Sequence, residues 1–128
     1  MAFLDLIGQS MTKRAKHLRL GNQGEEFAYQ YLIQQGHTIL ETNWRFEQGE
    51  IDLISVYDKF LIITEVKTRT SNKYGEPYED VSNKKQEKLI DTAVAYCETK
   101  DIQLELRFDI ISIVMEPKLI IDHIVDAF

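Results

Sequence analysis

Two acidic residues lie inside apolar runs that have the character of β-strands. Asp52 occurs in Glu-Ile-Asp-Leu-Ile, and Glu65 follows Leu-Ile-Ile-Thr. Strands tolerate Asp and Glu poorly, and burial of a carboxylate costs free energy unless the group is paired or bound to a metal ion. These two residues are therefore the first candidates for chemistry in this chain.

The spacing of the two runs predicts that these acids meet across a hairpin. Residues 50–57 and 60–70 are separated by a two-residue link, which favours an antiparallel turn. Paired residues then have numbers that sum to about 117, so Asp52 comes opposite Glu65. The two-residue period puts Lys67 on the same face as Glu65. A simple ion pair between Glu65 and Lys67 is the alternative interpretation when this strand is considered alone.

Adjacent carboxylates predict a metal site. Side by side they repel, so that one must take up a proton, whereas a divalent cation relieves the repulsion directly. Oxygen ligands of this kind suit Mg²⁺ or Mn²⁺, which bind one or two carboxylates together with water and substrate phosphate. No His–His or Cys–His spacing in the sequence indicates zinc. We therefore expect Asp52 and Glu65 to bind Mg²⁺ or Mn²⁺.

Two further acids are candidates for the same site. On the first expected helix, Glu25 borders the apolar stripe and can reach the edge of the sheet, whereas Glu26 points to solvent. A capping box between Asn22 and Glu25 is the alternative role, and the two roles are compatible. Glu50 shares a strand face with Asp52 and is either a ligand or a charge at the strand end.

Basic residues supply the candidates for phosphate binding. Lys85 and Gln86 lie in the first turn of a second expected helix, on the side that faces the sheet. A lysine and a helix N-terminus both suit a phosphate, and a solvated first turn is the alternative. Two basic groups, a dense one and a looser one, either stay solvated or flank a phosphate-binding groove: Lys13, Arg14, Lys16, His17 and Arg19, and Lys73, Lys84, Lys85 and Lys88. The net charge of −6 argues against tight binding of nucleic acid over the whole surface, but not against a local site.

The chain of 128 residues is long enough for one domain with a core. We expect a basic lead-in segment over 1–20, either a short helix or a mobile arm, and one domain over 21–128. The domain should contain helices at about 22–35 and 82–99 and strands at 38–44, 50–57, 60–70, 107–115 and 119–125. Asn22 and Ser82 are the expected N-caps, and Gly36 is the expected stop of the first helix. The strand–helix–strand step implies a parallel crossover and hence an α/β domain, a mixed sheet flanked by helices.

Helical periodicity also predicts which residues face the core. In the first helix these are Phe27, Ala28, Tyr31 and Leu32, and in the second they are Leu89, Ile90, Ala93, Val94 and Cys97. Asp109, in an apolar strand, is expected to pair with Arg107 or another base. The one cysteine excludes an intramolecular disulfide and fits a reducing cytoplasm. No apolar run approaches the ~18 residues that span a bilayer, so no membrane partner is expected.

Beyond these patterns, the chain resembles a known superfamily. Asp52 and Glu65-Val66-Lys67 match the D…(E/D)-x-K core motif of the restriction-endonuclease-like, or PD-(D/E)xK, superfamily, with Ile51 where that motif has proline. Over residues 20–128 the sequence looks like the small bacterial UPF0102 (YraN-type) family, which is related to archaeal Holliday-junction resolvases. The residues that carry this likeness are Gly21-Asn22-Gln23-Gly24-Glu25, Ala28, Tyr31-Leu32, Gly36, Asn43, Gly49-Glu50-Ile51-Asp52-Leu53-Ile54, Glu65-Val66-Lys67-Thr68-Arg69, Lys85 and Arg107-Phe108-Asp109.

The resemblance implies a restriction-endonuclease-like fold and a nuclease site. The catalytic set that it implies is Glu25, Asp52, Glu65 and Lys67. The expected ligands of Mg²⁺ or Mn²⁺ are Asp52, Glu65 and the Val66 carbonyl, with Glu25 and Glu50 as further candidates. The residues expected to contact nucleic acid are Lys85, Gln86 and Arg69.

Hydrolysis of nucleic-acid phosphodiester bonds is the expected function, with DNA, including branched DNA in repair or recombination, as the expected substrate. A homodimer is expected by analogy with the resolvases, since a four-way junction needs two paired cuts. One alternative is a non-catalytic nucleic-acid-binding module that works with a helicase or a recombination protein. Another is a domain that binds protein only. Stabilisation of the fold by Mn²⁺ would favour the enzyme over the last of these.

Overall fold

Helix α2 (Lys13–Gln34) opens the part of the chain that the computed structural model describes, residues 12–128. The other elements are a 3₁₀ turn, η2 (Pro77–Asp80), and a second helix, α3 (Asn83–Lys100). The strands are β1 (Thr38–Phe46), β2 (Gly49–Tyr57), β3 (Phe60–Arg69), β4 (Glu105–Val114) and β5 (Ile120–Ile124). Every predicted strand is present, with ends that differ by a few residues.

The start of α2 differs from the prediction. Thr12 is the N-cap, and its hydroxyl accepts a hydrogen bond of 3.1 Å from the Ala15 amide. The predicted cap, Asn22, lies inside the helix. The prediction was wrong because a good local cap was already present upstream and no proline interrupts the residues after it. Residues 13–20 of the expected lead-in segment are therefore helical, while residues 1–11 lie outside the described residues. The helix ends as predicted, with Gly36 at a φ of +99°.

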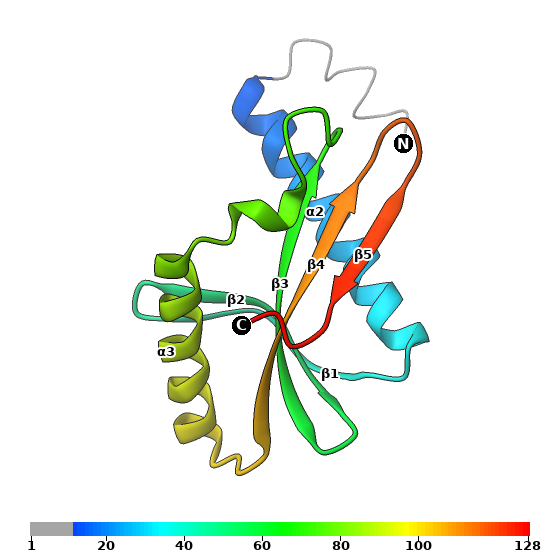
Figure 1. Ribbon diagram of the computed structural model, residues 1–128. Helices are drawn as coiled ribbons and strands as arrows, with labels where there is room; N and C mark the ends of the chain where they lie inside the picture. The colour runs from blue at the N-terminus through cyan, green and yellow to red at the C-terminus, as the bar shows by residue number, and fades with distance from the viewer. Residues whose placement is uncertain (1–11) are drawn as a thin grey trace.

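The five strands form one sheet in the order β1-β2-β3-β4-β5. β3 and β4 are parallel, as the crossover through α3 predicts, and the other neighbours are antiparallel. Figure 1 shows α2 passing behind the sheet and α3 on its other side. The α/β prediction of a mixed sheet flanked by helices is thereby confirmed.

Each face of the sheet carries one core cluster. On the α2 face the cluster comprises Ala28, Leu32, Leu53, Val66, Ile111 and Ile113. On the α3 face it comprises Ile51, Ile54, Leu61, Ile63, Leu89, Ala93, Tyr96 and Phe108. Because a single helix covers each face, the flanks of the helices stay open to solvent. Three residues predicted to face the core are for that reason at least one-third exposed, namely Phe27, Ile90 and Val94.

In α3, Leu89 and Ala93 are buried as predicted. Tyr96 is buried although the stripe did not include it, and Cys97 lies partly buried beside it, where burial raises the pKa of the thiol. Within residues 12–128, no helix has the length and apolar character needed to cross a membrane.

A buried polar cluster attaches the C-terminal strand to the sheet. Asp109 is fully buried and accepts hydrogen bonds from Arg107 (3.0 and 2.8 Å), His123 (2.7 Å) and the Asp126 amide (3.0 Å). The predicted pair with Arg107 is thus confirmed. Burial alone would raise the pKa of Asp109, but the hydrogen bonds from His123 and Arg107 lower it to about 2. The other ring nitrogen of His123 lies 3.2 Å from the Tyr31 hydroxyl, which links β5 to α2.

Candidate active site at the departure of β2 from β3

The site forms where β2 leaves the edge of β3. The two strands pair from Tyr57↔Phe60 to Leu53↔Thr64, with the register that the sequence predicts. Beyond this pair the backbone hydrogen bonds between the two strands stop. The Val66 amide of β3 instead donates a hydrogen bond of 2.9 Å to Oδ2 of the Asp52 side chain. Residues 49–52 of β2 continue in register with β1 toward α3 (Figure 1). This departure lets a carboxylate approach β3 from the side.

The Asp52 carboxyl lies against that of Glu65. Glu65 is only 4% exposed, and the two side chains share a hydrogen bond. Burial, followed by the negative charge of Glu65, raises the pKa of Asp52 to about 8, although the hydrogen bond from Val66 opposes this shift. The two predicted ligands therefore come together as a carboxyl pair that holds a proton near neutral pH.

Two lysines contact Glu65 of this pair. Lys85 Nζ lies 2.7 Å from Glu65 Oε2, and Lys67 Nζ lies 3.7 Å from the same oxygen. Burial and the nearby Lys85 lower the pKa of Lys67. Burial also acts against the charge of Lys85, but the contact with Glu65 outweighs it and raises the pKa of Lys85. Lys85 is therefore the ammonium that holds Glu65, and Lys67 is the lysine that loses its proton more readily.

Glu25 reaches the site because α2 packs very closely on β3. A Cβ atom at Gly24 would lie 1.8 Å from Thr68 Oγ1, so the approach requires glycine at this position. The neighbouring Glu25 accepts a hydrogen bond of 2.8 Å from the Asn43 side chain, and its charge contributes to the raised pKa of Asp52. The alternative capping box cannot form, since Asn22 lies within the helix.

Three other predicted site residues are engaged by neighbouring protein groups. Glu50 pairs with Arg45 across the β1–β2 ladder. The Gln86 side chain donates a hydrogen bond of 3.2 Å to the Val81 carbonyl. Arg69 donates two hydrogen bonds, of 2.6 and 3.3 Å, to the two oxygens of Asp80. The sequence contains no signal for these partners, because each lies on a different element or loop.

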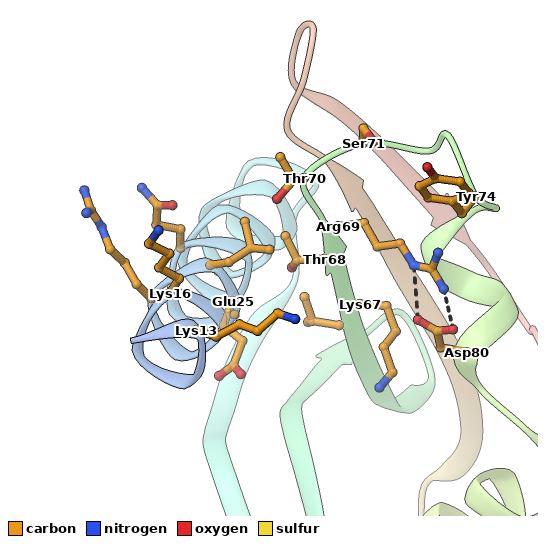
Figure 2. Close-up of a pocket in the computed structure, with 15 residues that line it drawn as sticks. Lys13, Lys16, Glu25, Lys67, Thr68, Arg69, Thr70, Ser71, Tyr74 and Asp80 are labelled. Carbon is orange, nitrogen blue, oxygen red and sulfur yellow. Dashed lines mark hydrogen bonds and ion pairs between the residues drawn. The ribbon is translucent and has the colours of Figure 1, made fainter. Parts of the chain in front are cut away.

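A basic cleft adjoins the carboxyl pair. It has a volume of about 1020 Å³ and lies between the first half of α2, the end of β3 and the loop that follows (Figure 2). Its cationic lining residues are Lys13, Lys16, Arg19, Lys67 and Arg69, against the two acids Glu25 and Asp80. Part of the first basic group of the sequence therefore does flank a groove. The side chains of Arg14 and His17 lie outside the described part of the chain.

The donor set determines which metal ion the site could hold. Within residues 12–128, no group of three or more His, Cys, Asp or Glu side chains could enclose an ion by itself. Asp52 and Glu65 alone suit Mg²⁺ or Mn²⁺, which complete their shells with water and substrate phosphate. The raised pKa of Asp52 reflects a repulsion that such a cation would relieve. The residues present thus fit a hard divalent ion.

Comparison with known sequences places most of this chain in one group of proteins. The model of the family described as "Uncharacterised protein family UPF0102" matches residues 24–113. A UPF0102 protein of Flavobacterium psychrophilum is 42% identical over 115 residues, which cover 89% of this chain and 97% of that protein. One from Caldanaerobacter subterraneus subsp. tengcongensis is 39% identical over 121 residues, covering 91% and 99%. One from Cytophaga hutchinsonii is 44% identical over 101 residues, covering 79% and 89%.

Proposed function

This chain belongs to the UPF0102 family, and we propose that it hydrolyses phosphodiester bonds of nucleic acids, DNA foremost, with the aid of a divalent cation. The observation that carries the proposal is the carboxyl pair of the partly buried Asp52 and the buried Glu65, in contact with Lys67 and Lys85 at the edge of a basic cleft. A binding surface for phosphates alone needs cations and has no use for two carboxyls in contact. Clustered acids beside cations instead suit a site that holds a metal ion against a phosphate.

The carboxyls of Asp52 and Glu65 would hold Mg²⁺ or Mn²⁺. The amide and carbonyl of a strand residue point to the same edge, so the Val66 carbonyl is expected on the side where its amide meets Asp52. When bound, such an ion polarises a phosphate oxygen and makes water a stronger nucleophile. Val66 therefore qualifies as the third ligand.

The remaining groups act on water and phosphate. Lys67 lies beside Glu65 and also lines the cleft, so it can orient the attacking water or stabilise charge that develops on the phosphate oxygens. Lys85 keeps Glu65 in position through their 2.7 Å contact. Glu25, which Asn43 holds in place, can accept a hydrogen bond from water beside Asp52.

Cleavage assays with the purified full chain test the proposal. The substrates are linear, flapped and four-way-junction DNA with Mn²⁺ or Mg²⁺. Asp52→Asn and Lys67→Ala should each reduce the cleavage rate by about 100-fold or more, the loss typical of a removed transition-state contact. Asp58→Asn and Lys59→Ala make the same chemical changes in the turn at the far end of the hairpin and should leave cleavage unchanged. Equal rates in all four variants would refute the proposal.

Metal binding gives a readout that does not depend on activity. Mn²⁺ should raise the melting temperature of the wild type, since a ligand that binds the folded state stabilises it. Asp52→Asn should respond less, although it removes a buried repulsion and should itself melt no lower than the wild type without metal. Nucleic-acid binding without a response to Mn²⁺ and without turnover would support the non-catalytic module instead.

A further inference from the structure

An exposed aromatic side chain lies on the rim of the basic cleft. Tyr74 lines the cleft and is 86% exposed, the largest exposed fraction among the large hydrophobic residues described. The turn that carries it is ordered by its own hydrogen bonds. The Gly75 amide donates to the Asn72 carbonyl (3.1 Å), and the Asn72 side chain donates to Glu76 (3.1 Å). Tyr74 is therefore held out into solvent by a defined turn.

The ring of Tyr74 is open to solvent and lies next to a lysine ammonium. Lys73 Nζ lies 5.6 Å from the ring centroid, the geometry of a cation–π contact. The ring makes a flat surface on which a nucleobase can stack, and Lys73 places a positive charge next to it. Stacking on aromatic side chains beside cations is how proteins bind unpaired nucleotides without regard to sequence.

The opposite wall of the cleft offers a row of cations. Lys13, Lys16 and Arg19 follow one another at three-residue spacing, which puts them on one side of α2 over about 9 Å of helix. Figure 2 shows Lys13 extending from the helix toward the β3 strand, Lys16 on the helix farther from β3, and Tyr74 beyond Arg69 on the other side. A row of this kind suits the phosphates of one strand, and Lys67, which lies beside Glu65, lines the same cleft.

We propose that this cleft binds a single-stranded segment of nucleic acid, with an unpaired base stacked on Tyr74 and the phosphates along the α2 row. The inference rests on the proposed function for its choice of nucleic acid as ligand, and it narrows the substrate to molecules with unpaired nucleotides, such as flaps, gaps or open branches. A continuous duplex already has its bases stacked on one another, so it offers no base face to Tyr74.

Binding measurements in EDTA test this inference apart from catalysis. The probes are labelled single-stranded DNA, single-stranded RNA and duplex DNA of equal length, followed by fluorescence anisotropy with the full chain. Tyr74→Ala should weaken single-strand binding roughly 5- to 150-fold and leave duplex binding within about twofold, the range measured for loss of one stacked base. Tyr74→Phe should bind like the wild type, because the ring is retained. Comparable losses with DNA and RNA would support recognition of unpaired bases, and a preference for one would identify the natural strand.

The α2 row has its own test. Lys13→Ala/Lys16→Ala should lower the slope of log affinity against log salt by about 1.4, at about 0.7 per phosphate contact with a single strand. The matched control is Lys59→Ala/Lys100→Ala, which removes the same charge from a turn and a helix end outside the cleft and should leave the slope almost unchanged.

The outcomes separate this inference from the proposed function. The inference would be overturned if Tyr74→Ala binds single strands like the wild type, or if it loses duplex binding as much as single-strand binding. This holds even if Asp52-dependent cleavage is found. Tyr74-dependent binding of single strands without cleavage in Mn²⁺ would support the inference and reject the proposed hydrolysis. A cleft that binds neither single strands nor duplexes would overturn it.

Discussion

Two glycines of α2, three residues apart, should respond in opposite directions to the same substitution. Alanine is about 1 kcal/mol more favourable than glycine within a helix. At Gly21 a new Cβ would meet nothing within 4 Å, so Gly21→Ala should stabilise the fold by about that amount. At Gly24 the new Cβ would lie 1.8 Å from Thr68 Oγ1 and 2.9 Å from Thr68 Cβ.

The second contact decides the cost at Gly24. Rotation of the Thr68 side chain moves its Oγ1 but not its Cβ, so α2 and β3 must shift apart. Overpacking of this kind typically costs about 1–3 kcal/mol. Because the helical gain is common to both variants, the difference between their free energies of unfolding should equal this cost, about 1–3 kcal/mol.

Urea unfolding measures this difference directly. The midpoint of Gly21→Ala should lie above that of the wild type, and the midpoint of Gly24→Ala should lie below that of Gly21→Ala by the order of 1 M at unchanged slope. Thr68→Ala in the Gly24→Ala background should recover part of the loss, since it removes Oγ1 and leaves Cβ. Equal midpoints for the two single variants would show that α2 does not approach β3 as closely as described.

Other predictions concern the buried polar groups and a helix end. Asp109→Asn leaves the largely buried Arg107 side chain without its charged partner and should lower the free energy of unfolding by about 3–5 kcal/mol in urea titrations, a loss below 1 kcal/mol being contrary evidence. Burial lowers the pKa of His37 from 6.5 to about 4, so the folded protein binds fewer protons than the unfolded chain in that window. Stability from this group is present above pH 6.5 and lost toward pH 4, at up to about 1.4 kcal/mol per pH unit. The His37→Asn variant isolates this contribution, because the raised pKa of Asp52 gives stability the opposite dependence on pH and does so equally in the wild type and the variant. The difference in free energy of unfolding between the two proteins should therefore grow from pH 4 to pH 6.5. Parallel pH profiles of stability would exclude the His37 contribution. Asp101 follows the last residue of α3 at a φ of +52°, a backbone conformation that glycine adopts without steric cost. Asp101→Gly should therefore raise the thermal midpoint by the equivalent of up to about 1 kcal/mol. A lower midpoint would mean that the Asp101 side chain stabilises the helix end.

Local patterns were sufficient for most of the fold. The hairpin register followed from a two-residue link and strand alternation, and Ser82 caps α3 as its sequence predicts. The start of α2 could not be predicted in this way, because Thr12 and Asn22 are both good caps, and their sequence environments do not decide between them. The width of the buried helix faces also depends on how many elements cover the sheet, which the helical period does not reveal.

The residues of the candidate site also differ in how far the sequence predicts their positions. Asp52, Glu65 and Lys67 were predictable because strand alternation and the hairpin register relate them to one another. The contact of Lys85 with Glu65 depends on how far α3 lies along the sheet, although the helical face was predicted. The partnership of Arg69 with Asp80 and the position of Tyr74 arise from the loop after β3, whose path only the packed structure defines.

The early departure of β2 has a consequence for solubility. From Glu65 to Arg69, β3 pairs with β4 on one side, while β2 has already turned away on the other. A bare strand edge invites pairing with a second chain and aggregation, and proteins commonly protect such edges with charged side chains. Here Lys67 and Arg69 project from that stretch, and the Val66 amide donates its hydrogen bond to the Asp52 carboxyl. The same charges that form the site therefore also guard the open edge against self-association.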